Sequence, residues 1–396
     1  MLRSLFSGIS GLRSHQTMLD VTGNNIANVN TTGFKSSQTQ FQDTLSQLVT
    51  GAGAAQQGTG GTNPAQVGLG VRVAGITTSF TQGASQLTGR STDMMIQGDG
   101  FFVVRKGAET FYTRAGSFDF DSTGQMTLPG DGALVQGWMA VNGVIDTNAP
   151  VTDLKVPAGT VMGAVASTTG SFVGNLPSDA AEGTTKSLDL EVYDAQGNPR
   201  DISLTLTKGA TGWTMSATDG TNTYPATGTP EAVTFDADGK LTSTGSFTLG
   251  GVAVDLSTIT GYASVDTVAT GTQNGRSAGT LQSFQLGADG TITGSFSNGL
   301  KQAIGRIALA NFTNPAGLQK SGGSLFSSSV NSGDAQVGVA GAGGRGSLAG
   351  GALEMSNVDL SSEFTSLIIA QRGFQANSRV ITTSDEVLQE LVNLKR

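Results

Sequence analysis

The stretch EFTSLIIAQRGFQANS, residues 363–378, lies near the end of a 396-residue chain and carries its clearest helical pattern. Apolar residues recur there every three or four positions, which is the spacing of one face of an α-helix. Extended over 360–392, this spacing marks ten positions, of which seven are apolar. They are Leu360, Phe364, Leu367, Gln371, Phe374, Ser378, Ile381, Asp385, Leu388 and Val392. A stripe this narrow is typical of a coiled-coil seam rather than of a helix on a large core.

The opening of the chain repeats the pattern, with six apolar residues at eight such positions: Leu2, Leu5, Ile9, Leu12, Gln16, Leu19, Gly23 and Ile26. Isolated helices are marginal in water, so a pair of them needs further partners, which other copies of the chain would supply. We therefore predict a polymer interface formed by Leu5, Ile9, Leu12, Leu19, Ile26, Leu360, Phe364, Leu367, Phe374, Ile381 and Leu388. The alternative is that both helices pack on a central globular domain.

Between the two helical stretches, the apolar pattern changes to strict alternation. The segment SLDLEVYDAQGNPRDISLTL (187–206) has an apolar residue at every second position on both sides of a turn, which predicts a β-hairpin. The segments FDSTGQMT (120–127), FDADGKLT (235–242) and LGADGTIT (286–293) share one frame with Asp and Gly at the turn. We interpret these as three further strand–turn–strand units.

These patterns predict a multidomain α+β protein, with a terminal coiled-coil pair of helices and nested all-β domains in the middle. Glycine-rich stretches at 50–68 and 327–351 occupy mirror positions in the chain. The predicted parts are 1–28 with 357–396 as terminal coiled-coil helices, 29–68 with 327–356 as extended connecting segments, 69–150 with 283–326 as an inner β domain, and 151–282 as an inserted outer β domain.

Composition excludes several functional classes. Charged residues make up 13% of the chain, the net charge is −8 and no long basic block occurs, so we expect no nucleic-acid partner. No apolar run reaches the length of a membrane-spanning helix, so we expect no membrane insertion. The chain has no cysteine, which rules out disulfides and thiol chemistry. The opening residues do not resemble a cleavable signal peptide.

Three motifs suggest chemistry but have simpler interpretations. GAGGRG (341–346) matches a phosphate-loop spacing, but no apolar-periodic helix follows it. DADG (236–239) lacks the remaining ligands of a calcium loop and is better explained as a turn. His15, the single histidine, has no acid or nucleophile pattern near it. We predict no catalytic site, no cofactor and no metal.

The segment GNNIANVNTTGFK (23–35) is the most distinctive polar motif, with four Asn within seven positions. Asn tolerates left-handed backbone and bonds to nearby backbone groups, so one interpretation is a helix end followed by a turn. The other interpretation is that these amides bond to the backbone of neighbouring subunits. The residue pattern alone favours neither.

NNIANVNTTGFK (24–35) resembles the amino-terminal signature of the bacterial flagellar axial proteins of rod and hook, and residues 356–396 resemble their carboxy-terminal signature. The blocks QGDGFFVV (97–104), 112–138 and 294–318 are similar to the β domain that hook and distal rod proteins share. On this resemblance, the family signature includes Asn24, Asn25, Asn28, Asn30, Gly33, Phe34, Gln371 and Asn377. The presence of 151–282 favours a hook subunit over a shorter rod protein.

The resemblance implies a structural subunit, not an enzyme, that self-assembles into the tubular, curved hook and transmits torque from rod to filament as a flexible joint. It also implies export through the flagellar type III machinery without a cleaved signal, and an extracellular position in the flagellum. Implied partners are further copies of the chain, the distal rod protein, the hook cap and the hook–filament junction protein. The alternatives are a distal rod variant, or a secreted β-rich carbohydrate-binding protein or enzyme with oligomerising ends.

Overall fold

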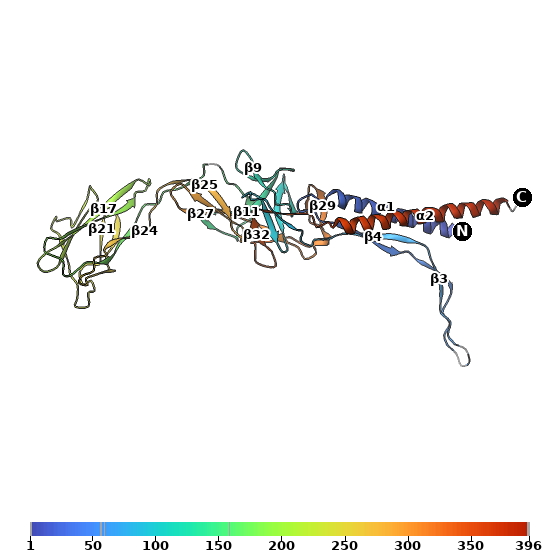
Figure 1. Cartoon of the computed structure of the whole chain (residues 1–396), viewed down its shortest axis with the longest axis horizontal. Coiled ribbons are helices and arrows are strands. Elements are labelled where there is room, and N and C mark those ends of the chain that lie inside the picture. Colours follow the sequence, from blue (N-terminus) through green and yellow to red (C-terminus); the bar gives the residue numbers. More distant parts are fainter. Residues whose placement is uncertain (1, 56–57, 59, 158, 394–396) are drawn as a thin grey trace. The chain divides into compact units, whose positions relative to one another are not determined.

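The computed structural model describes residues 2–55, 58, 60–157 and 159–393, with one long helix near each end of the chain and β-strands between them (Figure 1). Helix α1 spans Leu2–Ala27 and helix α2 spans Leu360–Asn393. The side chain of Asp359 caps α2, since its Oδ1 accepts hydrogen bonds from the backbone N–H groups of Ser361 and Ser362 at 2.8 and 3.3 Å. This arrangement confirms the predicted α+β class with helical ends.

The chain forms two compact units. The first contains Met1–Pro157, Phe284–Thr293 and Ala303–Arg396, and the second contains Ala158–Ser283 and Gly294–Gln302. Strands β25 (Gly279–Leu286), β26 (Thr291–Phe296) and β27 (Lys301–Ile307) belong partly to each unit. The four-part division made from the sequence stays a prediction.

In the first unit, the two helices run antiparallel. The hydroxyl oxygens of Ser4 and Ser384 lie 3.4 Å apart, and the side-chain amide of Asn25 donates to the carboxylate of Glu363 at 2.9 Å. The start of α1 therefore lies beside the end of α2. Two ladders of exposed or half-exposed strands follow α1: β1 (Ser37–Asp43) pairs with β4 (Val71–Thr78), and β2 (Ser46–Thr50) pairs with β3 (Ala65–Gly68).

The β body of the first unit is an antiparallel sheet around an aromatic core. Its ladder runs through β27, β11 (Ala133–Val141), β7 (Phe101–Lys106), β8 (Glu109–Thr113), β30 (Leu325–Ser327) and β29 (Gln319–Gly322). Short strands attach to it: β9 (Asp119–Phe120), β10 (Met126–Leu128), β12 (Val144–Ile145), β13 (Thr152–Asp153) and β28 (Leu309–Asn311), with a 3₁₀ turn at Pro315–Gly317. The core includes Phe101, Tyr112, Trp138, Phe312 and Phe326.

The glycine-rich segment 327–351 is more ordered than its composition suggests. It supplies β31 (Gln336–Gly338), which pairs with β28, and β32 (Ser347–Gly350), which pairs with β6 (Met94–Gln97). The next strand, β33 (Ala352–Glu354), pairs with β5 (Ser85–Leu87). Leu348 is 3% exposed, so sparse apolar anchors and backbone pairing with distant strands order a segment that sequence composition marked as a connector.

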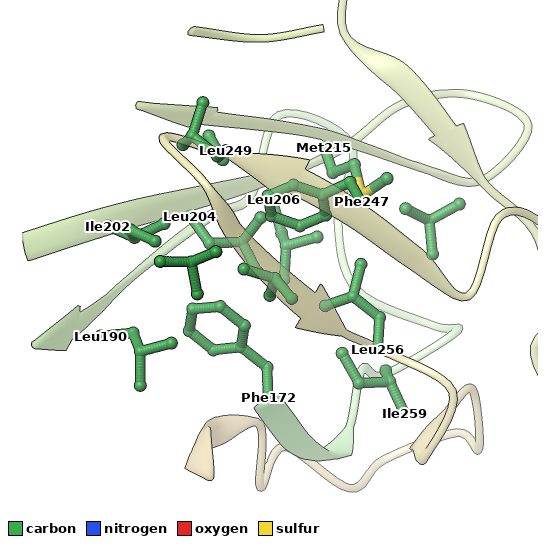
Figure 2. Close-up of a cluster of buried hydrophobic side chains, with 14 of the residues drawn as sticks. Phe172, Leu190, Ile202, Leu204, Leu206, Met215, Phe247, Leu249, Leu256 and Ile259 are labelled. Atoms are coloured by element: carbon green, nitrogen blue, oxygen red, sulfur yellow. The ribbon is translucent and has the colours of Figure 1, made fainter. Parts of the chain in front are cut away.

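The second unit is all β, with two sheets whose side chains meet in one core. One sheet contains β16 (Thr185–Tyr193), β17 (Pro199–Lys208), β18 (Trp213–Thr218), β19 (Thr223–Tyr224) and β20 (Glu231–Val233). The other contains β21 (Ser246–Leu249), β22 (Val252–Asp255), β15 (Thr169–Asn175), β23 (Ile259–Thr260) and β24 (Ala269–Gln273), and β14 (Val161–Met162) pairs with β25. Figure 2 shows Phe172 directed at the leucines of β17 within this core.

The hairpin predicted at 187–206 is confirmed as β16 paired with β17, and Leu190, Ile202 and Leu204 are at most 3% exposed. The three repeated turns also adopt the predicted geometry. Their glycines, Gly124, Gly239 and Gly290, have φ of 79°, 74° and 83°, and in each turn an Asp carboxylate accepts at least one backbone N–H group. Among the described residues, no helix is long and apolar enough to cross a membrane.

Candidate functional site, the helical pair and its polar joint

The seam between α1 and α2 is built mainly from small and polar residues. The facing pairs are Ser4 with Ser384, Gly8 with Ile381, Gly11 with Asn377, His15 with Gly373, and Asn25 with Glu363. A Cβ at Gly11 would lie 2.6 Å from Oδ1 of Asn377, and one at Gly373 would lie 2.5 Å from the ring of His15. Glycine in a helix interior costs about 1 kcal/mol relative to alanine. Here it allows the two helices to approach closely.

This geometry corrects the predicted seam on α1. The stripe at Leu5, Ile9 and Leu12 is not the line that meets α2, because the facing positions lie one residue earlier. Small residues occupy the line of closest approach, and larger side chains stay beside it. The sequence signal was misleading here because apolar periodicity gives glycine and serine no weight.

The predicted interface residues lie beside the seam and are only partly covered by their own chain. Half-buried residues are Leu5, Ile9, Leu12, Leu19, Ile26, Leu367, Ile381 and Leu388. Leu360, Phe364 and Phe374 are 40%, 52% and 38% exposed. Of the predicted interface residues, the structure thus leaves three large apolar side chains of α2 open to contact.

Exposed apolar residues of α2 fall on two sides of the helix. At about 100° per residue, one group, which we call flank A, contains Leu360, Phe364, Ile368 (55% exposed) and Phe374. Ile369, Val380 and Val387, which are 56%, 43% and 44% exposed, form a second group on another side, which we call flank B. Flank B was not among the predicted interface residues.

A polar stripe separates the two flanks on the side of α2 away from α1. It contains Thr365, Arg372 and Arg379, which are all exposed and recur every seven residues. Contiguous exposed apolar surface is uncommon on monomeric proteins and marks interaction sites. The two flanks are therefore the strongest candidate contact surfaces on α2.

A buried charge cluster lies beyond the pair, where the chain leaves α1. Nζ of Lys35 lies 2.7 Å from Oε1 of Glu354, and Nη1 of Arg114 lies 3.3 Å from Oε2 of the same carboxylate. The side chains of Lys35, Glu354 and Arg114 are 0–2% exposed. Glu354 also accepts a hydrogen bond from the backbone N–H of Gly83 at 2.9 Å, and Lys35 donates to the carbonyl of Thr81 at 2.7 Å.

Amide and ammonium groups extend this cluster into what we call the polar joint, which comprises residues 33–37, 79–83, 113–115, 320 and 354–357. Oδ1 of Asn357 accepts the backbone N–H of Ser36 at 2.8 Å, and Nδ2 donates to the carbonyl of Ser79 at 2.9 Å. Lys320 donates to the carbonyl of Lys35 at 3.0 Å. Three parts of the first unit that are distant in sequence are thus connected by hydrogen bonds.

Burial controls the electrostatics of the joint. It lowers the pKa of Lys35, while the neighbouring Glu354 carboxylate opposes this shift. It also lowers the pKa of Arg114 and of Lys320. At the helical pair, burial raises the pKa of Glu363, and its hydrogen bond from Asn25 acts in the opposite direction. Water screens the charges of Lys35 and Arg114 poorly, so both depend on the carboxylate of Glu354.

The Asn-rich motif bonds largely within its own chain. Asn25 is 1% exposed, and its amide exchanges two hydrogen bonds with the backbone of Ser37 at 2.8 and 3.0 Å. Asn28 donates to the carbonyl of Asn24 at 2.9 Å and accepts from the hydroxyl of Thr31 at 3.0 Å. For these residues the structure supports the helix-end interpretation.

The other signature residues have varied surroundings. Gly33 has a φ of 67°, and a Cβ there would lie 2.5 Å from the backbone nitrogen of Ala115, so only glycine fits. The ammonium of Lys320 lies 4.9 Å above the ring of Phe34. Asn30 and Gln371 are exposed, and Asn377 packs on Gly11.

Within the described residues, the motifs that suggested chemistry have structural roles in turns, connections and packing. Oδ1 of Asp236 accepts two backbone N–H groups of its own turn at 3.0 and 2.7 Å, and residues 341–346 connect β31 to β32 without a helix. His15 packs on Gly373, and the centroid of its ring lies 5.7 Å from the centroid of the Phe41 ring. No group of three acidic or histidine side chains suited to a metal occurs within the described ranges.

One cavity of about 470 Å³ lies in the second unit and bears on the carbohydrate-binding alternative. Its lining includes Trp213, Phe235, Tyr262, Asp236 and Lys208. Trp213 is only 2% exposed, and the carboxylate of Asp236 is occupied by its turn. Tyr262 is 54% exposed, so the cavity presents one open aromatic ring and a single acid whose Oδ1 is held by its own turn.

Sequence reasoning missed the Lys35–Glu354–Arg114 cluster. Lys35 closes the Asn-rich motif, but the other two residues lie 319 and 79 positions further along the chain. A pair of charges so far apart leaves no periodic signal. The one available clue was the scarcity of charge in a chain with 13% charged residues.

Four family models match successive parts of the chain. They are "Flagella basal body rod protein" at 5–35, "Flagellar hook protein FlgE/F/G D1 domain" at 95–171, "Flagellar basal body protein FlaE D2 domain" at 165–313, and "Flagellar basal body rod FlgEFG protein C-terminal" at 349–394. The first and last cover most of the two helices and residues 33–35 and 354–357 of the joint. This order of helical ends around two β modules defines a bacterial flagellar axial protein.

Whole-chain relatives make the assignment more specific. The chain is 40% identical over 463 residues to the flagellar hook protein FlgE of Treponema pallidum and 39% identical over 450 residues to that of Borreliella burgdorferi, with 100% of each chain covered. It is 35% identical over 397 residues to the flagellar basal-body rod protein FlgG of Bacillus subtilis, again with 100% of both chains covered. The chain belongs to the flagellar hook protein family, FlgE, and is a structural subunit of the bacterial flagellum.

Proposed function

We propose that copies of this chain polymerise through the two flanks of α2 and the apolar side of α1, which carries Leu5, Ile9, Leu12 and Leu19, into the curved tube of the flagellar hook. The observation that carries this proposal is the presence of two separate apolar flanks on α2, divided by a polar stripe. One partner molecule can cover one flank, so a closed dimer would leave the other exposed. Covering both requires at least two neighbours, which favours an open-ended assembly.

Within such a tube, the helical pairs would form the inner layers and the β units would lie outside them. Polar β surfaces can shift against one another without exposing large apolar patches, which suits a joint that bends while it transmits torque. Family membership supports export by the flagellar type III machinery to the outside of the cell. It also supports end contacts with the distal rod protein, the hook cap and the hook–filament junction protein.

A straight rod is the second candidate, because the FlgG relative aligns over the whole chain. Electron microscopy of the purified protein under assembly conditions separates the candidates. We expect curved tubes whose subunits repeat along a helical lattice. Straight tubes would favour the rod. A folded protein that stays monomeric at every concentration tested would refute polymerisation.

A further inference from the structure

Glu354 holds a special position in the polar joint, because it is the shared anion of two buried cations. Among the described residues, it is the one carboxylate within 4.0 Å of either Lys35 or Arg114. Along the chain it lies 319 residues from Lys35 and 240 from Arg114. The three residues belong to the N-terminal segment, the β body and the C-terminal segment.

We infer that Glu354 acts as a latch that lets the N-terminal segment (33–37) dock on the β body only together with the C-terminal segment (352–357). The two ends of the subunit then dock in one step instead of independently. This inference rests on the proposed function only insofar as the docked ends present the polymer-forming helices.

Electrostatics oppose docking of the N-terminal segment by itself. Without Glu354, the ammonium of Lys35 would enter a dry site beside the guanidinium of Arg114, and its remaining acceptor would be the carbonyl of Thr81. Two like charges in a poorly solvated site repel, and removing one partner from a buried ion pair is strongly destabilising. Arg114 already carries a buried Nε without a hydrogen-bond partner in the described structure, and Asp99, the other acid that favours its charged form, lies beyond ion-pair distance.

Backbone hydrogen bonds also make docking of the N-terminal segment depend on the C-terminal segment. The N–H of Gly33 donates to the carbonyl of Glu354 at 2.8 Å, and the N–H of Ser36 donates to Oδ1 of Asn357 at 2.8 Å. The N–H of Gly83 donates to the carboxylate of Glu354 at 2.9 Å. If the C-terminal segment is absent, these three buried or half-buried donors lose their partners together, and each unpaired buried donor is costly.

The latch delays helix pairing until the chain is nearly complete. A chain with only its first 353 residues available lacks both α2 and the shared carboxylate. Its N-terminal segment is then held off the β body by Lys35 and Arg114. The apolar side of α1 therefore stays in a flexible segment until α2 can cover part of it.

Hydrogen exchange of the full-length monomer, below its assembly concentration, tests the latch. Glu354→Gln keeps shape and removes the anion, while Lys35→Met removes one cation and leaves the Glu354–Arg114 pair neutral. We expect Glu354→Gln to raise amide exchange at least tenfold in both 2–37 and 354–393, with β16–β18 unchanged as an internal reference. Lys35→Met should have a much smaller effect, and the double variant should exchange more slowly than Glu354→Gln. Asp153→Asn, which breaks the partly exposed pair with Arg105 in the same unit, is the matched control.

Faster exchange confined to 354–393 in Glu354→Gln would overturn the inference, as would equal effects of Glu354→Gln and Lys35→Met. If Glu354→Gln fails to fold, Glu354→Asp serves instead, because its shorter side chain keeps the charge but loosens the contacts. It should increase exchange at both ends in parallel, and loosening at one end contradicts the latch. Failure of the wild-type protein to form tubes would refute the proposed function and leave this result standing.

Discussion

A charge placed on flank B should block assembly while the monomer survives. Ile369 is 56% exposed, so Ile369→Asp removes contacts from less than half of the side chain in the monomer. Full burial of an isoleucine is worth about 1.5–3 kcal/mol, so the monomer should lose about 1 kcal/mol. The helix cap, the seam and the β units do not involve this residue.

In the tube the cost is larger. The exposed part of Ile369 would contribute about 1 kcal/mol on burial, and desolvating an unpaired carboxylate adds several kcal/mol. A total of about 4 kcal/mol per subunit corresponds to roughly a thousandfold increase in the concentration needed for assembly, since each 1.4 kcal/mol is a factor of ten.

Sedimentation of tubes against total protein concentration measures this threshold, and circular dichroism checks the monomer. Thr365→Asp is the matched control, because the same charge on the polar stripe should shift the threshold less than threefold. Tubes that form from Ile369→Asp at the wild-type threshold would show that flank B is not an interface. Equal inhibition by Thr365→Asp would show that added charge, not position, is responsible.

Three further predictions test other parts of the molecule. Phe374→Asp on flank A should also prevent tubes but cost the monomer more than Ile369→Asp, since this ring is only 38% exposed; normal sedimentation would exclude flank A. Gly373→Ala should lower the thermal stability of the helical pair, since its Cβ would lie 2.5 Å from the ring of His15; a stabilised pair, as helix propensity predicts, would contradict the close seam. A hydrogen bond to Glu231 raises the pKa of Tyr224 to about 12, so its contribution is complete below pH 10 and is lost as pH rises toward 12. The free energy of unfolding of the wild type, measured with denaturant, should therefore fall by about 2 kcal/mol over this range, and the same loss in Glu231→Gln would disprove the cause.

Local patterns predicted the helical ends and the β16–β17 hairpin, because each is specified by residues within about thirty positions of one another. The seam was mislocated by one residue on α1, since Ser4, Gly8 and Gly11 carry no hydrophobic signal. The line along which two helices approach most closely depends on the residues of both helices, so the apolar pattern of either helix alone does not predict it.

The polar joint could not be predicted for a different reason. The two ion pairs of its charge cluster connect residues 319 and 240 positions apart, and a lone Lys or Glu has the same local appearance whether it is buried or exposed. Strands β31 to β33 were missed because glycine-rich composition indicates a linker unless distant pairing partners are known. Which apolar residues stay exposed on α2 likewise depends on where α1 lies.

The glycines of the seam have a mechanical consequence. Gly11 receives Asn377 and Gly373 receives His15, so each helix has a socket for a side chain of the other. A slip of one turn, about 5.4 Å, would carry His15 off Gly373 and against the larger Ala370 or Asn377. The two helices therefore cannot slide lengthwise past each other without breaking contact. Each helical pair behaves as a strut of constant length, and any stretching or compression along the helical layer of a bent tube must occur between struts.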